Sequence, residues 1–228
     1  MDSIWGLSFL LLASLYAYLG GHLEDARSRV VYAAVLAWSL RLAVYVTWRN
    51  WGEAEDPRYA AMREHWGQAF WWGSFLNVFA LQACLSWVIA MPLYALFLNE
   101  PPPWTPLDSL AGVMFLVGFW FETVADWQLA RFKRVPAHRG KVLRTGLWRY
   151  SRHPNYFGES LVWWSFYLFA VAAGGWWTVF SPVLMTYLLL RVSGVPLLES
   201  HLANTKPEYR DYVASTNAFF PWWPRPRP

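Results

Sequence analysis

The sequence predicts an all-α protein, a polytopic bundle of helices embedded in a membrane. Hydrophobic residues make up 56% of its 228 positions. No charged side chain lies between His65 and Glu100, or from residue 160 to residue 190. About 20 apolar residues suffice to cross a bilayer. Because a bilayer admits only helices or closed barrels, and these runs are long rather than short and alternating, we expect helices.

Six spans are predicted, at about 4–21, 29–48, 69–91, 108–130, 156–173 and 176–192. The first has no basic segment before it and no cleavage site, so we expect a retained helix rather than a signal peptide. The pair Gly174-Gly175 separates the last two spans, and short interfacial helices are expected at about 194–217. We expect residues 1–228 to form a single membrane-embedded domain.

The basic residues predict the orientation. Loops 49–68, 131–155 and 193–228 carry 15 of the 19 Lys and Arg side chains, whereas the alternate loops carry 2. Basic loops stay on the cytoplasmic side, so both termini are expected there. The pI of about 9.3 does not indicate nucleic acid, because the charge is concentrated beside the membrane and no recognition motif accompanies it. Lipid headgroups are the simpler partner for these cations.

Two acidic residues lie inside the fourth predicted span. Glu122 and Asp126 are four residues apart, so they share a helical face, and Lys133 lies two turns further along it. Intramembrane carboxylates are costly, which makes a functional site the default hypothesis. The alternative is an ion pair of Asp126 with Lys133 or Arg131.

A second polar face begins the fifth span, where Asn155 and Glu159 repeat the four-residue spacing. Pro154 at the start of this helix leaves the backbone N–H groups that follow it available to an anion. Four cationic or titratable side chains precede it in the chain: Arg144, Arg149, Arg152 and His153. We therefore expect a phosphate-bearing ligand that comes from the cytosol.

The motifs in this region carry a family resemblance. They are Glu122-x-x-x-Asp126, followed by Gly146-Leu-Trp-x-Tyr150-Ser-x-x-Pro154-Asn155-Tyr156-Phe157-Gly158-Glu159. With Gly194-Val-Pro196-Leu-Leu-Glu199 and Phe219-Phe220-Pro221 near the C-terminus, the pattern resembles the C-terminal domain of the steroid 5α-reductase family, in particular its bacterial membrane branch. Members of this branch usually begin with one further helix, so we expect this chain to lack a first span or to begin at an internal start.

The resemblance implies a reductase of the bacterial inner membrane that uses NADPH against a C=C bond of a lipid-like enone, whether sterol, isoprenoid or fatty. It implies that Asp126 and Asn155 contact the cofactor and that Glu122 and Glu159 line the same pocket. Arg41 and Lys133 would hold the phosphates. The other candidate cofactor-binding residues are Arg144, Arg149, Arg152, His153 and Tyr156.

Such a reduction needs a hydride at the β-carbon and a donor that stabilises the developing enolate. Tyr45, one turn beyond Arg41, is the first candidate, with interfacial packing as its alternative role. Glu122 is the second, because burial favours a protonated carboxylic acid. Glu55 and Asp56 are either catalytic acids or a surface pair. No metal site is expected, since the five histidines are scattered and Cys84 is alone.

Two other functions stay open. A methyltransferase of the isoprenylcysteine type, which uses S-adenosylmethionine, shares the pattern Arg152-His153-Pro154-x-Tyr156-x-Gly158, but it more often has paired acids where this chain has Glu199-Ser200. A non-catalytic lipid-binding protein is favoured by Trp38, which stands where steroid-reducing members have a tyrosine. A soluble dinucleotide fold is excluded because no Gly-x-Gly-x-x-Gly occurs. The sequence does not indicate the oligomeric state.

Overall fold

The protein is built from helices. The computed structural model describes residues 3–52, 57–100, 102–192, 194–195, 199, 202, 205–206 and 208–225. No strand occurs within these residues, which confirms the predicted all-α class. Among the described residues, two helices, α2 (Ala26–Asn50) and α7 (Pro106–Lys133), are long and apolar enough to cross a membrane, and there are three such spans if a bent pair of helices counts as one. With the shorter apolar helices, this is a polytopic membrane bundle.

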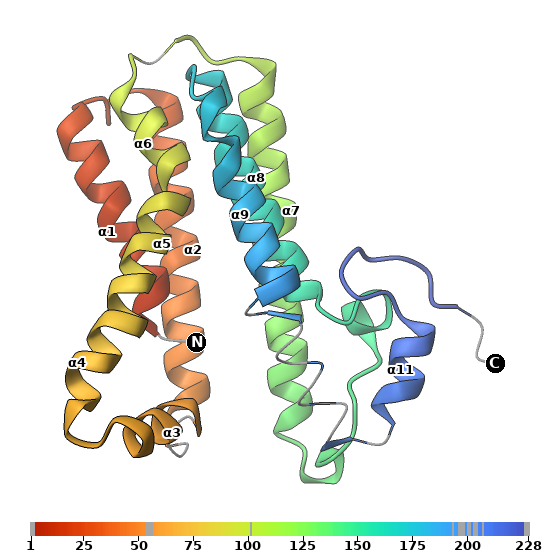
Figure 1. Cartoon of the computed structure of the whole chain (residues 1–228). Helices are drawn as coiled ribbons and strands as arrows, with labels where there is room; N and C mark the ends of the chain where they lie inside the picture. The colour runs from red at the N-terminus through yellow and green to blue at the C-terminus, as the bar shows by residue number, and fades with distance from the viewer. Residues whose placement is uncertain are drawn as a thin grey trace. The chain divides into compact units, whose positions relative to one another are not determined.

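The chain divides into two compact units, Met1–Pro102 (unit 1) and Pro103–Pro228 (unit 2). Unit 1 contains α1 to α6, and unit 2 contains α7 to α9 and α11 (Figure 1). That both units act as one domain stays a prediction.

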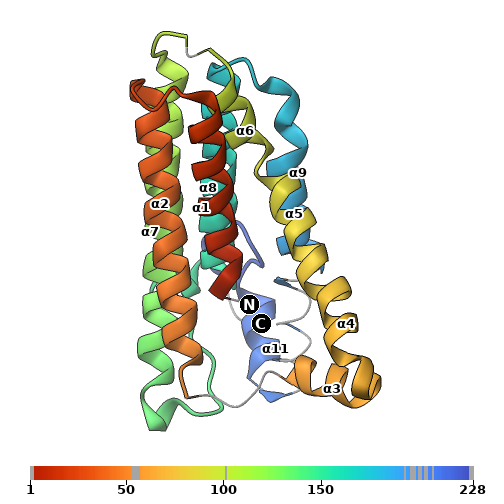
Figure 2. The same ribbon diagram turned by 90° about the vertical axis from the view of Figure 1, so that its left-hand side faces the viewer.

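Unit 1 begins with a hairpin in which α1 (Ser3–Gly20) lies beside α2 (Figure 2). The start of α2 is set by Asp25, whose carboxylate accepts a hydrogen bond from the N–H of Ser28 at 3.1 Å and so satisfies a donor that the helix leaves open. Between the two helices, Trp38 is fully buried, and its ring lies 5.7 Å from that of Phe9 in an edge-to-face contact. Trp38 is thus part of the core of unit 1.

The rest of unit 1 is an interrupted helical run, which differs from the single span predicted at 69–91. It comprises α3 (Pro57–Trp66), α4 (Phe70–Ser74), a π-helical segment (Phe75–Ala80), α5 (Leu81–Ile89) and α6 (Met91–Leu98). The parts Met62–Gly73 and Val78–Ile89 meet at a bend of 55°. A second break lies at Ala90, because Pro92 is favoured in the first turn of a helix and begins a new one there.

Unit 2 begins with α7, whose start is fixed by a capping box. The N–H and the hydroxyl of Thr105 donate to the Asp108 carboxylate at 2.7 and 2.8 Å. Pro106 occupies the first turn, where its missing N–H costs no helical hydrogen bond. Arg131 and Lys133 lie in the last turn, where positive charge complements the helix dipole.

Helix α8 (Pro154–Ala172) runs along α7, and α9 (Phe180–Tyr187) packs on α8 (Figure 1). The predicted break at Gly174-Gly175 is confirmed, since Gly174 has a φ of +83°, which favours glycine. The hydroxyls of Ser160 and Thr186 are 2.9 Å apart and join α8 to α9. Such polar contacts hold helices together where lipid offers no hydrophobic driving force.

The backbones of α7 and α8 touch where two glycines face each other. A Cβ placed on Gly158 would lie 2.5 Å from the backbone nitrogen of Glu122 and 2.6 Å from the carbonyl oxygen of Gly118. A Cβ on Gly118 would lie 2.8 Å from the carbonyl oxygen of Gly158. Both helices therefore depend on the absence of a side chain at these two positions.

We predict that Gly158→Ala separates α7 from α8 and lowers the free energy of unfolding by about 1–3 kcal/mol, as overpacking typically does. The melting temperature of the purified protein measures the effect. Gly112→Ala is the matched control on α7, because its Cβ would meet only a ring carbon of Phe169 at 3.9 Å. Equal melting temperatures for the two variants would contradict the close helix contact.

Candidate functional site

Polar residues of α7 and α8 meet just beyond the glycine contact. Glu122, Asp126 and Glu159 are 3%, 6% and 4% exposed. The side-chain amide of Asn155, in the first turn of α8, donates through Nδ2 to Oδ1 of Asp126 at 3.3 Å. The structure thus brings together the two residues for which cofactor contact was predicted, with both pocket-lining acids on the same pair of helices.

The amide oxygen of Asn155 is a second distinctive feature of this site. It is buried and accepts no hydrogen bond from any residue that the structure describes. Buried polar atoms are nearly always paired, so this acceptor beside a carboxylate is open to a donor from a ligand or from water. We refer to Glu122, Asp126, Asn155 and Glu159 as the acidic cluster.

The connection from α7 to α8 is fastened to α7. Gly146 has a φ of +61° and so allows a tight turn, after which the N–H of Leu147 donates to Oε1 of Gln128 at 3.0 Å. The indole of Trp148 donates to the carbonyl of Ala125 at 3.1 Å. These contacts fix the start of α8 against the helix that carries two of the four acidic-cluster residues.

Arg152 and His153, both predicted to bind phosphate, converge instead on an acid of the chain itself. Nε of Arg152 and Nε2 of His153 lie 2.8 and 3.1 Å from the same carboxylate oxygen, Oε1 of Glu199. Burial raises the pKa of Glu199, but the hydrogen bonds from His153 and Arg152 and the charge of Arg152 outweigh it and hold the pKa at about 2. Glu199 was missed as a functional candidate. The need of a buried arginine for a counter-ion is the signal that could have found it.

The described residues between Glu199 and Arg225, which we call the C-terminal segment, cover Arg152 and His153 through further hydrogen bonds. Nη1 of Arg152 donates to the carbonyls of Thr216 and Val213 at 2.7 and 3.2 Å. Its backbone N–H donates to the carbonyl of Asn217 at 2.9 Å, and Oγ of Ser151 donates to that of Phe219 at 2.8 Å. The loop before α8 therefore holds the end of the chain in place.

The short helix α11 (Tyr209–Ser215) forms part of this segment. The buried phenol of Tyr212 donates to the carbonyl oxygens of Trp148 and Ser151. Burial and the neighbouring phenol of Tyr209 raise the pKa of Tyr212, so it stays a hydrogen-bond donor at neutral pH. Helix α11 is thus one short helix within the region 194–217, where short interfacial helices were predicted.

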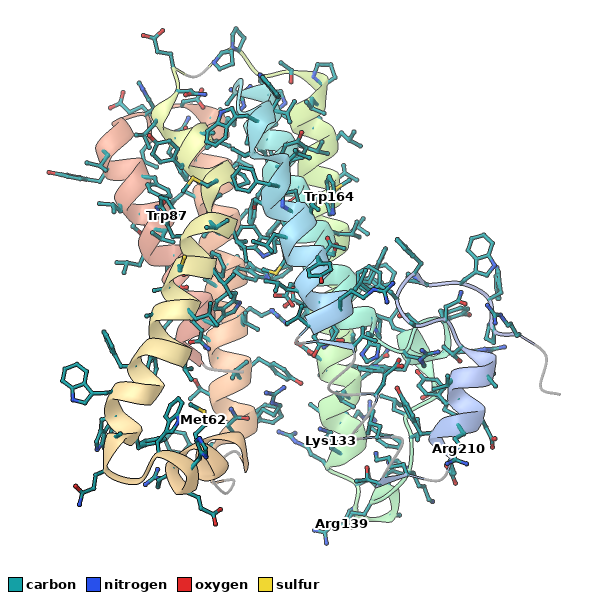
Figure 3. The ribbon with its side chains drawn as sticks, viewed as in Figure 1. Met62, Trp87, Lys133, Arg139, Trp164 and Arg210 are labelled. Atoms are coloured by element: carbon teal, nitrogen blue, oxygen red, sulfur yellow. The ribbon has the colours of Figure 1, made fainter. Side chains whose placement is uncertain are left out.

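The other predicted cations differ in surroundings. Arg144 donates to the carbonyl of Glu208, and its guanidinium lies 5.7 Å from the ring centre of Tyr212. Arg149 is exposed and lies over the ring of Tyr150 at 5.9 Å. Figure 3 shows Lys133, at the end of α7, at the same end of unit 2 as Arg139 and Arg210, whereas Trp164 on α8 lies away from that end. Among the predicted phosphate ligands, Lys133 and Arg149 are exposed, whereas Arg41 and Arg144 are half-buried and Arg152 is buried.

Arg41 and Tyr45 lie on α2 in unit 1, both half-buried and one turn apart. The ring of Tyr45 contacts its own helix, with the guanidinium of Arg49 at 5.7 Å and the ring of Trp48 at 6.2 Å. Tyr156 stacks on His153 at 5.5 Å. Glu55 and Asp56 lie outside the described residues.

We predict that the stability contributed by Glu199 is present above its ordinary pKa of 4.5 and is lost as the pH falls toward about 2. The melting temperature of the wild type should therefore exceed that of Glu199→Gln at pH 7, and this difference should shrink at pH 3. Glu208→Gln removes an exposed carboxylate from the same segment, so its melting temperature should match that of the wild type at both pH 7 and pH 3. A difference that does not depend on pH would contradict the ion pair.

The chain is similar to one protein family and to one curated protein of a yeast. A model of the family described as "Protein of unknown function (DUF1295)" matches residues 1–216. The uncharacterized protein C594.04c of Schizosaccharomyces pombe is 27% identical over 251 residues, which cover 97% of this chain and 72% of that protein. No solved structure matches the chain significantly.

Proposed function

Because the chain belongs to the DUF1295 family, a steroid 5α-reductase-like family, we propose that it is a membrane-embedded reductase. It uses NADPH to reduce a carbon–carbon double bond in a lipid-like enone of sterol, isoprenoid or fatty type. It belongs to the bacterial branch of the family and lies in the inner membrane with both termini on the cytosolic side. The observation that carries this proposal is the hydrogen bond between Asn155 and Asp126 at the meeting of α7 and α8.

The acidic cluster has the groups that a dinucleotide needs. The ribose hydroxyls and the carboxamide of NADPH donate hydrogen bonds, and the cluster offers the carboxylate of Asp126 and the open amide oxygen of Asn155 as acceptors. Lys133 and Arg149 are exposed cations for the phosphates, and Arg41 is a further one by resemblance. Arg144 and Arg152 already donate to the C-terminal segment, so we assign them to holding that segment as well.

Bound NADPH would supply the hydride that reduces the β-carbon of the enone, while a proton reaches the α-carbon. The protein's part is to bind both molecules, to exclude water and to hold a donor at the carbonyl oxygen, where negative charge develops. Tyr45 and Glu122 are the donors that we propose. A phenol carries its proton at neutral pH, and burial favours the protonated form of a carboxylic acid, which is the form of Glu122 that this role needs.

The first test is thermal stabilisation of the detergent-purified protein by NADPH, NADH and S-adenosylmethionine, measured side by side. A ligand that binds only the folded state raises the melting temperature. We expect a shift with NADPH, and we expect Asp126→Asn to weaken NADPH binding about tenfold or more, because hydrogen bonds to charged groups contribute about 1.5–3 kcal/mol. Membrane insertion should not change.

Asp211→Asn is the matched control, since it makes the same substitution at an exposed position of α11. A shift with S-adenosylmethionine alone would assign the chain to the methyltransferases. No shift with any of these ligands, together with binding of a sterol or polyprenyl lipid, would indicate a non-catalytic lipid-binding protein. Equal NADPH affinity in the wild type and Asp126→Asn would overturn the assignment of the acidic cluster.

We predict that Tyr45→Phe lowers turnover about a hundredfold, the lower end of what a positioned proton donor contributes, with NADPH affinity unchanged. Oxidation of NADPH in the presence of a sterol 4-en-3-one, a polyprenal or a fatty enone provides the measurement. Tyr18→Phe removes a hydroxyl from a side chain that is 82% exposed in the same unit and serves as the control. Wild-type turnover of Tyr45→Phe would leave Glu122 as the donor.

A further inference from the structure

Glu199 links two parts of unit 2 that are far apart in the sequence. One of its carboxylate oxygens receives both Nε of Arg152 at 2.8 Å and Nε2 of His153 at 3.1 Å. Arg152 is 9% exposed and His153 is 2% exposed. A buried guanidinium without a counter-ion is strongly unfavourable, so the arrangement of Arg152 depends on the negative charge of Glu199.

The same pair determines how α8 begins. His153 occupies the N-cap position of α8, and its N–H donates to Oγ of Ser151 at 3.1 Å. Its ring lies parallel to that of Tyr156, 5.5 Å away with an angle of 7° between the planes. Asn155, between His153 and Tyr156 in the chain, makes the hydrogen bond to Asp126. A displacement of His153 would therefore move the first turn of α8 and the amide of Asn155.

We propose that Glu199 is a positioning residue: by holding the His153 ring and the Arg152 guanidinium, it fixes the first turn of α8 and thereby the Asn155–Asp126 pair. The acidic cluster then takes its binding geometry only while the C-terminal segment is docked on the loop before α8. The part of this inference that concerns ligand binding rests on the proposed NADPH site. The part that concerns the first turn of α8 does not.

The experiment compares the full-length wild type with Glu199→Gln and Glu208→Gln by hydrogen–deuterium exchange and by NADPH affinity. Gln keeps the size of Glu and removes the charge, and Glu208 offers the same change on the same segment at an exposed position. In Glu199→Gln we expect amide exchange at residues 155–158 to rise about tenfold and the Kd for NADPH to rise about tenfold, since the lost contacts are hydrogen bonds to a charged group. Exchange in α9 should rise less than exchange at residues 155–158, and Glu208→Gln should match the wild type in both measurements.

Three results would overturn the proposal. Unchanged exchange at residues 155–158 would show that Glu199 does not hold α8, and a rise of equal size in α9 would show only a general loss of stability. Unchanged or tighter NADPH binding by Glu199→Gln would show that the carboxylate does not position the site, and the tighter case would mean that it competes with the ligand for Arg152 and His153.

Failure of the proposed function is a separate outcome. If the wild type binds no NADPH, the reductase proposal fails, whereas the exchange at residues 155–158 still decides the role of Glu199 in α8. If Glu199→Gln does not fold, Glu199→Asp keeps the charge but shortens its reach. We expect it to raise exchange at the same residues, and wild-type exchange in that variant would overturn the proposal.

Discussion

The contact between the backbones of α7 and α8 at Gly118 and Gly158 is the constraint on which unit 2 depends. Two helices at this separation have no choice of register, because a shift along either axis would bring a side chain against the facing backbone. With Gly158 lying against the backbone of Glu122, the next turn towards the end of α7 brings Asp126 to the amide of Asn155. In lipid, apolar surface gains little from burial against another helix, so small residues and polar contacts hold the helices together instead.

A second dependence runs from the end of the chain back to the start of α8. The guanidinium of Arg152 is shared among a carboxylate and two carbonyl oxygens of the C-terminal segment. The phenol of Tyr212 reaches two carbonyls of the loop that precedes the helix. The loop at 131–155 therefore has two kinds of cation: those that hold the C-terminal segment by hydrogen bonds, such as Arg152, and those that are exposed to solvent, such as Arg149.

Much of the fold could be predicted, because uncharged runs of bilayer length leave few alternatives to helices and because Gly174-Gly175 interrupts them visibly. The sequence indicated that Asp126 and Asn155 belong to one site, because each has an acidic residue one helical turn away, Glu122 and Glu159, and so lies on a polar helix face. The breaks around α5 and α6 were missed because most of this apolar run contains no residue that predicts a bend. Pro92, at the start of α6, is the residue that could have shown the second break. The partner of Arg152 was missed because it lies 47 residues away in the sequence, and local spacing does not show which distant acid reaches a buried cation. The roles of the candidate site residues in binding and catalysis stay predictions.

If α7 begins at one face of the hydrocarbon core, as the proposed membrane reductase requires, its length brings the acidic cluster close to the opposite face. A helix rises about 1.5 Å per residue, so Glu122 lies about 24 Å along the axis from the start of α7 and Asp126 about 30 Å. The hydrocarbon core is about 30 Å thick, and the remaining turns to Lys133 extend past it. Apolar molecules would reach such a site by lateral diffusion within the leaflet. For the proposed lipid-like substrate, the quantity that governs occupancy of the site is then its mole fraction among the lipids, and dilution of the bilayer with inert lipid would lower that occupancy even at constant total concentration.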